Sequence, residues 1–142
     1  MNTDICVFHL LHNAHQAAKR SFTCELEPTQ YIVLKALREL GDGVNQKRLV
    51  GATGIDRSTV SNILWRLSKK GLVTMRISTQ DTRAVSVFLT DQGKRAVLRA
   101  TEAAERANEE ILGKIPQAQR RAFLANLERI GRGPARAVRE AA

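Results

Sequence analysis

The spacing of apolar residues changes abruptly at Gly71, and this change limits the folds open to the chain. Before Gly71, apolar residues recur at the intervals of three and four that are typical of an amphipathic helix, at Val60, Ile63, Leu64 and Leu67. After it, apolar residues alternate with others over residues 72–78, and the alternation resumes over residues 85–89 beyond the polar stretch 79–83. The sequence therefore predicts a helix that Asp56 caps, followed directly by a β-hairpin.

Further helices are predicted on both sides of this segment. Upstream, Pro28 suits the first turn of a helix that ends at Gly41, and Asn45 is a good N-cap for a short helix that ends near Gly54. The other predicted helices cover residues 4–23, run from Asp91 to the interruption at Pro116, and carry Phe123, Leu127 and Ile130 before Gly131 breaks the pattern. This order predicts a mainly α fold with a small β-hairpin wing, that is, a winged helix-turn-helix with N- and C-terminal dimerisation helices.

The length of 142 residues is that of one domain. Three regions are expected within it: residues 1–27 as an N-terminal dimerisation helix, residues 28–92 as the winged helix-turn-helix DNA-binding region, and residues 93–142 as C-terminal dimerisation helices. The terminal helices are amphipathic but too rich in alanine to form a second core alone. Two copies are therefore expected to intertwine as a closed two-fold homodimer.

Positive charge is concentrated in the middle of the chain. The sequence has 23 Lys and Arg residues against 14 Asp and Glu, a net charge of +9, and residues 44–100 alone hold 11 basic and 3 acidic residues. Such a segment favours nucleic acid as the partner.

No stretch is long and apolar enough for a membrane helix, the N-terminus lacks the pattern of a secretory signal, and two cysteines do not make a disulfide scaffold. We therefore expect a cytoplasmic protein that does not bind membranes.

The segment after Asp56 carries the residue types that a major-groove helix needs. Short donors and acceptors for base edges lie near its N-terminal end, at Ser58, Thr59, Ser61 and Asn62. Cations long enough to reach phosphates are Arg57, Arg66, Lys69 and Lys70, and the predicted DNA-binding set also includes Gln46, Lys47 and Arg76. A plain amphipathic surface helix is the alternative, but the clustering of small polar residues at one end favours DNA binding.

The predicted hairpin tip carries a basic residue. Arg83 is expected to enter the minor groove, where the negative potential attracts Arg. Asp81 is expected to brace Arg83 or Arg76 and so to fix the shape of the tip.

Five short blocks together resemble the MarR family of bacterial regulators, which are winged-helix dimers, and the resemblance covers essentially the whole chain. The blocks are residues 28–31 (PTQY), 56–61 (DRSTVS), 66–73 (RLSKKGLV), 81–83 (DTR) and 89–93 (LTDQG). The resemblance implies a homodimer on a palindromic operator, acting as a repressor that a small ligand or an oxidant releases. It also implies that Ser58, Thr59, Asn62 and Arg66 read or flank bases and that Arg83 enters the minor groove. Asn62 departs from the Arg or Lys that is common at its position.

The N-terminal segment contains all three histidines and both cysteines. Their spacing rotates them around a helix and no metal-binding motif accompanies them, so neither a metal nor another cofactor is expected.

The expected ligand pocket is lined by His9, His12, Arg20 and Tyr31, and the expected effector is an anionic aromatic or acyl compound. The place of Cys6 is similar to that of the peroxide-sensing cysteine in one branch of the family.

These patterns predict a sequence-specific DNA-binding transcriptional regulator, a repressor that a small-molecule ligand releases. Two alternatives remain open: a thiol-based redox-sensing regulator that acts through Cys6, and a non-specific nucleic-acid-binding protein. An enzyme is not expected, because the sequence has no Gly-rich phosphate loop, no nucleophile elbow and no helix with paired metal ligands.

Overall fold

The computed structural model describes residues 6–77 and 85–133. The chain forms two units, Met1–Ala107 and Asn108–Ala142, and the boundary between them falls within a long helix. The first unit contains α1 (Val7–Ser21), α2 (Pro28–Leu40), β1 (Val44–Asn45), α3 (Gln46–Thr53), α4 (Arg57–Lys69), β2 (Val73–Ile77), β3 (Val85–Leu89) and most of α5 (Asp91–Leu112). The second unit contains the end of α5 and α6 (Gln117–Arg132).

Helices α2, α3 and α4 begin and end at residues whose side chains or backbones cap them. Pro28 opens α2, and a capping box joins Glu27 and Gln30 at its start. The side chain of Asn45 accepts the backbone N–H of Arg48 at the start of α3, and Gly54 ends that helix in the left-handed conformation, with a φ of 71°. The predicted bounds of these three helices are therefore confirmed.

The three strands form one small antiparallel sheet in the order β1-β3-β2. The predicted hairpin is confirmed, with Val73 opposite Leu89 and Ile77 opposite Val85. Its tip lies outside the described residues. Strand β1 was not predicted, because two residues are too few to show alternation; it pairs Val44 with Val87 of β3. The sheet therefore has three strands, and the short first one connects α2 to α3.

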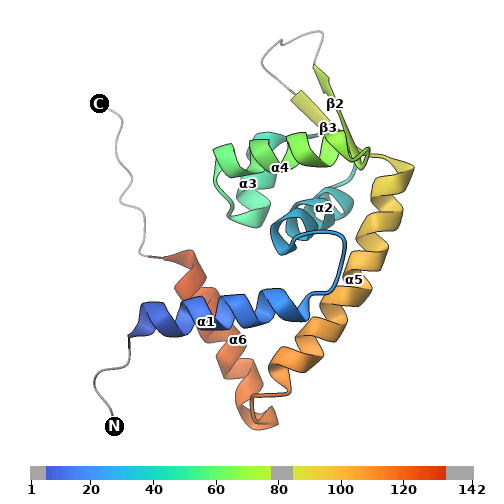
Figure 1. The fold of residues 1–142 in the computed structure, drawn as a ribbon. Helices are drawn as coiled ribbons and strands as arrows, with labels where there is room; N and C mark the ends of the chain where they lie inside the picture. The colour runs from blue at the N-terminus through green and yellow to red at the C-terminus, as the bar shows by residue number, and fades with distance from the viewer. Residues whose placement is uncertain (1–5, 78–84, 134–142) are drawn as a thin grey trace, which may run out of the picture. The chain divides into compact units, whose positions relative to one another are not determined.

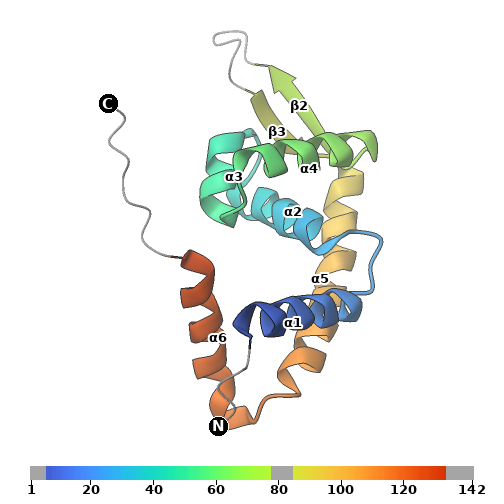
Figure 2. The same ribbon diagram turned by 60° about the vertical axis from the view of Figure 1, so that its left-hand side comes forward.

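Helices α2, α3 and α4 gather around one apolar core, with the hairpin at the end of α4 (Figures 1 and 2). The largest fully buried side chains come from these helices, from the sheet and from the first half of α5, and include Leu34, Leu49, Leu64, Val87 and Val97. This core fixes the orientation of α4 by holding its apolar side in place.

The start of α5 is attached to the loop that follows α4. The Thr90 hydroxyl donates to the carbonyl oxygen of Gly71 (2.6 Å) and accepts the backbone N–H of Gly93 (3.0 Å). A Cβ at Gly93 would lie 2.0 Å from the carbonyl oxygen of Leu72. Glycine is therefore required at this position for the close approach of the two backbones.

Helices α1 and α6 differ from the rest, because neither has a buried residue in this single chain. Apolar side chains on both are solvent-exposed, and they include Val7, Phe8 and Leu10 on α1 and Leu124 and Ile130 on α6. Helix α1 ends at Ser21, two residues before the predicted end at Thr23. Helix α6 continues through Gly131, which was expected to break it, and is capped by Gly133.

Candidate nucleic-acid interface

Helix α4 presents one polar side and buries the other. The four predicted apolar residues, Val60, Ile63, Leu64 and Leu67, are all buried. Of the predicted base-reading residues, Ser58, Ser61 and Asn62 are exposed and Thr59 is half-buried. The core thus holds α4 with the polar side chains of its first two turns outward, as a groove-reading helix requires.

A network of hydrogen bonds organises the first turn of α4 around the carboxylate of Asp56. The hydroxyls of Thr59 and Ser58 donate to it at 2.6 and 2.8 Å, and the backbone N–H of Thr59 donates at 3.0 Å. These bonds, the Thr59 hydroxyl first and the Ser58 hydroxyl next, lower the pKa of Asp56 from 3.8 to about 2. The carboxylate is therefore ionised and caps the helix at neutral pH.

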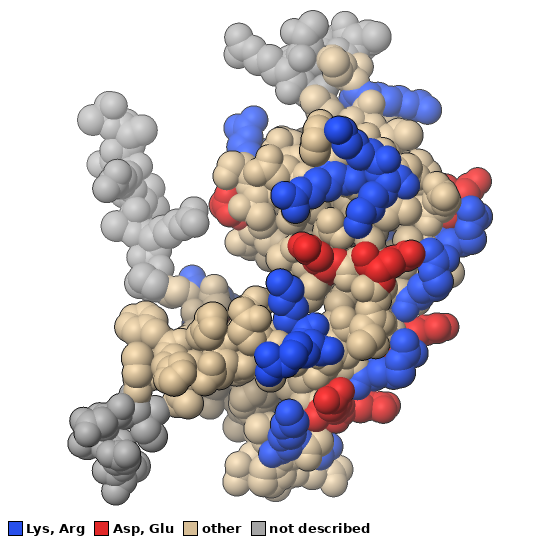
Figure 3. Space-filling view, in the orientation of Figure 1, with Lys and Arg blue, Asp and Glu red and all other residues tan. Residues whose placement is uncertain are grey.

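Basic side chains gather over α4 on the face shown in Figure 3. Arg57, Arg66 and Lys69 on α4, and Lys70 directly after it, are all exposed. The ammonium of Lys69 lies 4.0 Å from the ring centroid of Trp65, which is 55% exposed. Long exposed cations beside short polar side chains form a surface that can contact phosphates and bases together.

The other predicted DNA-binding residues lie on neighbouring elements. Gln46 and Lys47 are at the start of α3, half-buried and exposed respectively. Arg76 on β2 is exposed and stacks over the ring of Phe88, with its guanidinium carbon 4.9 Å from the ring centroid. Arg83 and Asp81 lie outside the described residues, so their predicted roles stay predictions.

The N-terminus of α2 lies beside α4 and adds a residue that the sequence analysis did not select. A small pocket of about 210 Å³ is lined by residues of both helices, namely Glu27, Thr29, Gln30, Thr59, Asn62, Ile63 and Arg66. Thr29 is exposed in the first turn of α2. The signal in the sequence was its place after Pro28, which puts its hydroxyl at a helix N-terminus, where phosphates bind readily.

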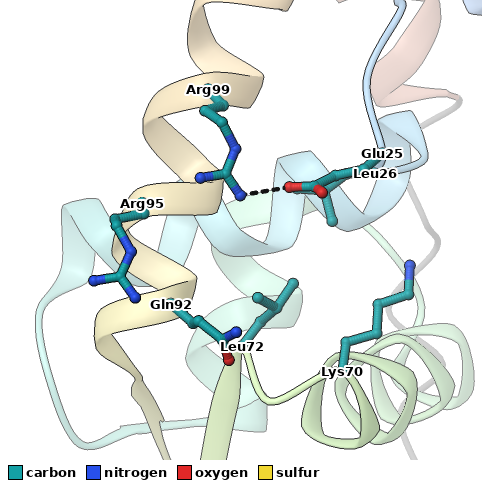
Figure 4. Close-up of a pocket in the computed structure, with 7 residues that line it drawn as sticks. All are labelled: Glu25, Leu26, Lys70, Leu72, Gln92, Arg95 and Arg99. Atoms are coloured by element: carbon teal, nitrogen blue, oxygen red, sulfur yellow. Dashed lines mark hydrogen bonds and ion pairs between the residues drawn. The ribbon is translucent and has the colours of Figure 1, made fainter.

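A larger pocket, of about 450 Å³, lies between the α1–α2 connection, the end of α4 and the first turns of α5 (Figure 4). Arg99 points across it to Glu25, and the two form an ion pair of 2.7 Å. Arg95 and Lys70 add two more cations to its wall, and Gln92 adds an amide. Three cations against one carboxylate make this a pocket that suits an anion.

The residues predicted to bind the effector do not line this pocket. His9, His12 and Arg20 are exposed on α1. Tyr31 is half-buried on α2; its ring packs against Phe22 with centroids 5.6 Å apart, and its hydroxyl donates to that of Thr101 at 3.5 Å. The structure thus brings none of the four together with the cations of the larger pocket.

Both cysteines are free thiols. Cys6 is exposed at the N-cap of α1, where its side chain makes no capping hydrogen bond, and Cys24 is half-buried.

Within residues 6–77 and 85–133, no group of His, Cys, Asp or Glu is placed to hold a metal ion. None of the helices in that part of the chain is long and apolar enough to cross a bilayer.

The helices α2 to α4, the hairpin after α4 and the exposed polar side of α4 define a winged helix-turn-helix protein. The sequence pattern of the MarR family matches residues 26–85. The chain is 31% identical over 129 residues to the HTH-type transcriptional repressor NicR of Pseudomonas putida, an alignment that covers 87% of this chain and 81% of NicR. The chain therefore belongs to the MarR family of transcriptional regulators.

Two solved structures extend the similarity to the fold. BpsR of Bordetella bronchiseptica, whose DNA binding is regulated by 6-hydroxynicotinic acid, has a TM-score of 0.77 and 31% identity, over 87% of this chain and 97% of that one. PcaV of Streptomyces coelicolor, in complex with its natural ligand, has a TM-score of 0.85 and 26% identity, over 94% of this chain and 96% of that one. The predicted mainly α, winged helix-turn-helix fold is thus confirmed, while dimerisation through the terminal helices stays a prediction.

Proposed function

We propose that the chain is a homodimeric repressor that binds a pseudo-palindromic DNA operator and is released from it by a small anionic ligand. The observation that carries the proposal is α4, which holds short polar side chains outward in its first turns and exposed cations along its length. Repression is supported by the likeness to NicR, and ligand control by the likeness to BpsR. The chain is proposed to act in the cytoplasm and to catalyse no reaction.

The dimer is proposed to form through residues 1–27 and 93–142, which flank the DNA-binding region 28–92. The exposed apolar side chains of α1 and α6, which a partner copy would cover, support this proposed dimer. Two copies of α4 would then enter successive major grooves about 34–36 Å apart. Sedimentation equilibrium of the purified chain tests the assembly; a monomer at micromolar concentration contradicts it.

Within each half-site, Ser58, Thr59, Ser61 and Asn62 are proposed to face bases. Phosphates are proposed to be contacted by the surrounding cations and polar groups, which are Gln46, Lys47, Arg57, Arg66, Lys69 and Arg76, with Arg83 in the minor groove and Asp81 bracing it. Selection of bound duplexes from a random pool, followed by footprinting, tests this. A protected palindrome supports the proposal. Uniform binding to every duplex would instead identify a non-specific nucleic-acid-binding protein.

The effector is proposed to be an anionic aromatic or acyl compound. Two places can hold its carboxylate: the predicted set of His9, His12, Arg20 and Tyr31, and the pocket in which Arg99 pairs with Glu25. Because that ion pair is exposed, breaking it costs little stability, so substitutions there test binding and not folding.

The effector experiment uses 6-hydroxynicotinic acid, the regulator of BpsR, as the probe. Thermal stabilisation and release of a selected operator are measured for the wild type, for Arg20→Gln and for Arg99→Gln. Loss of both effects in one variant alone assigns the carboxylate to that site. Absence of any effect with this probe and with a panel of aromatic carboxylates and acyl thioesters contradicts ligand control.

Redox control through Cys6 is the second candidate, and the exposure of its thiol at a helix N-terminus favours it. Peroxide should then release the operator from the wild type and not from Cys6→Ser, whereas Cys24→Ser should respond as the wild type does. Equal release of all three proteins would eliminate this candidate.

A further inference from the structure

The carboxylate of Asp56 holds the hydroxyl hydrogens of two residues that are proposed to face DNA. One carboxylate oxygen accepts the Thr59 hydroxyl at 2.6 Å, and the other accepts the Ser58 hydroxyl at 2.8 Å. With a pKa of about 2, this carboxyl carries no proton at neutral pH and can only accept hydrogen bonds. The direction of both bonds is therefore fixed: each hydroxyl is the donor and Asp56 is the acceptor.

A hydroxyl has a single hydrogen. In Ser58 and Thr59 that hydrogen is directed at Asp56, so only oxygen lone pairs remain for another partner. Turning either hydrogen toward DNA would remove one of the three bonds on a carboxylate that the approaching phosphates already repel. The network therefore opposes the reversal of these hydroxyls on binding.

Bases in the major groove differ in what they offer an acceptor. The amino groups of adenine (N6) and cytosine (N4) are donors, whereas guanine and thymine present acceptor oxygens at the corresponding positions. We propose that Asp56 sets the base preference of α4 by making Ser58 and Thr59 acceptors only, so that the bases facing them on the contacted strand are adenine or cytosine. This inference rests on the proposed function of α4 as the groove-reading helix.

The proposal makes Asp56 a positioning residue for specificity: it touches no base in this scheme and acts through the hydroxyls that it holds. A role in helix capping alone would affect stability and leave base choice unchanged. The substitution Asp56→Asn separates the two roles. Its amide oxygen still accepts the Thr59 backbone N–H, while its NH₂ donates to a hydroxyl oxygen and frees that hydroxyl's hydrogen for DNA.

The experiment selects bound duplexes from a pool with randomised half-sites and sequences them. Thr59→Val and Ser58→Ala, which remove one hydroxyl each, first locate the operator positions whose base choice depends on these side chains. Every base pair carries one amino donor (adenine or cytosine) and one acceptor oxygen (guanine or thymine) on opposite strands, so base analogues must identify the group that is contacted. Replacing adenine by purine, or cytosine by 2-pyrimidinone, removes the amino group and should weaken wild-type binding about fivefold, the effect of one hydrogen bond, whereas removing the opposite oxygen should not. In Asp56→Asn, binding to sites with guanine or thymine on the contacted strand should rise about fivefold relative to the wild-type site.

Asp42→Asn is the matched control, because it also removes one negative charge but from a residue outside this network. It should raise affinity for all duplexes equally and leave base choice as in the wild type. Circular dichroism and thermal unfolding verify that both variants are folded.

Each outcome has a distinct meaning. Wild-type binding that is weakened by loss of the acceptor oxygen and not by loss of the amino group overturns the inference, and so does an Asp56→Asn protein that binds with unchanged base choice. Because the base analogues are tested on the wild type, the test stands even if Asp56→Asn unfolds. A wild type that enriches no sequence contradicts the proposed function itself, which is a separate result.

Discussion

Helices α4 and α1 are similar in length, with 13 and 15 residues, yet they differ in what holds them. Helix α4 buries four residues in the core and has a carboxylate cap that accepts three hydrogen bonds. Helix α1 buries none, and its N-cap residue makes no side-chain hydrogen bond. Helix α4 is thus held within one chain, whereas α1 leaves its apolar side chains exposed.

The largest effect expected from this contrast is on stability. Leu64 is fully buried on α4, so Leu64→Ala should lower the free energy of unfolding by about 2–5 kcal/mol. Urea unfolding of the monomeric species measures it. The corresponding change on α1, Leu10→Ala, should cost the monomer far less, because Leu10 is exposed. If both substitutions lowered the free energy of unfolding equally, the contrast between α4 and α1 would be wrong.

The next effect concerns assembly. Phe8 is 85% exposed on α1, and as an aromatic residue at a dimer interface it would be a binding hot spot. Phe8→Ala should weaken dimerisation by about 2 kcal/mol or more, roughly thirtyfold in dissociation constant, and leave the stability of the monomer unchanged. Sedimentation equilibrium over a range of concentrations measures the change. An unaltered dimer would remove α1 from the interface.

A smaller effect separates base contacts from phosphate contacts on α4. Asn62→Ala should reduce discrimination at one operator position by about 1–3 kcal/mol, while Arg66→Ala should weaken binding to all sequences and lower the salt slope by about 1. Operator titrations at several salt concentrations measure both. Lys19→Ala on α1 is the control, and a salt slope that changes equally in that variant would contradict the assignment of α4.

The smallest effect is a pH dependence of the cap. Since the pKa of Asp56 in the folded protein is about 2, below the value of 3.8 for the free side chain, its ionised form stabilises the fold above about pH 4. That contribution is lost as the pH falls toward 2. The difference in urea midpoint between the wild type and Asp56→Ala should therefore be present at pH 7 and shrink near pH 2. Cys6→Ala, at the uncapped start of α1, should show no such pattern.

Helices α2 to α4 could be predicted from the sequence because their signals are local. Asn45 and Asp56 cap α3 and α4 through bonds to their next turns, Pro28 favours the first turn of α2, and Gly54 ends α3 in the left-handed conformation. The predicted bounds followed from these residues. Strand β1 could not be found this way, since its existence depends on pairing with a strand some forty residues later.

Features assembled from distant segments were also missed. Thr29 reaches the α4 surface only because α2 packs beside α4, and the pocket of Lys70, Arg95 and Arg99 joins three separate parts of the chain. The periodicity of apolar residues and the spacing of motifs carry no information on which distant segments come into contact. The four residues predicted to bind the effector were chosen as polar or aromatic groups on the two helices expected to line the cleft, and their role stays a prediction.

The junction at Thr90 and Gly93 has a mechanical consequence. The turn after α4 and the first turn of α5 are in direct contact. Two hydrogen bonds join them, and their backbones approach too closely to admit a methyl group. A displacement of the start of α5 would therefore shift the base of the hairpin with it, because the two segments share these contacts.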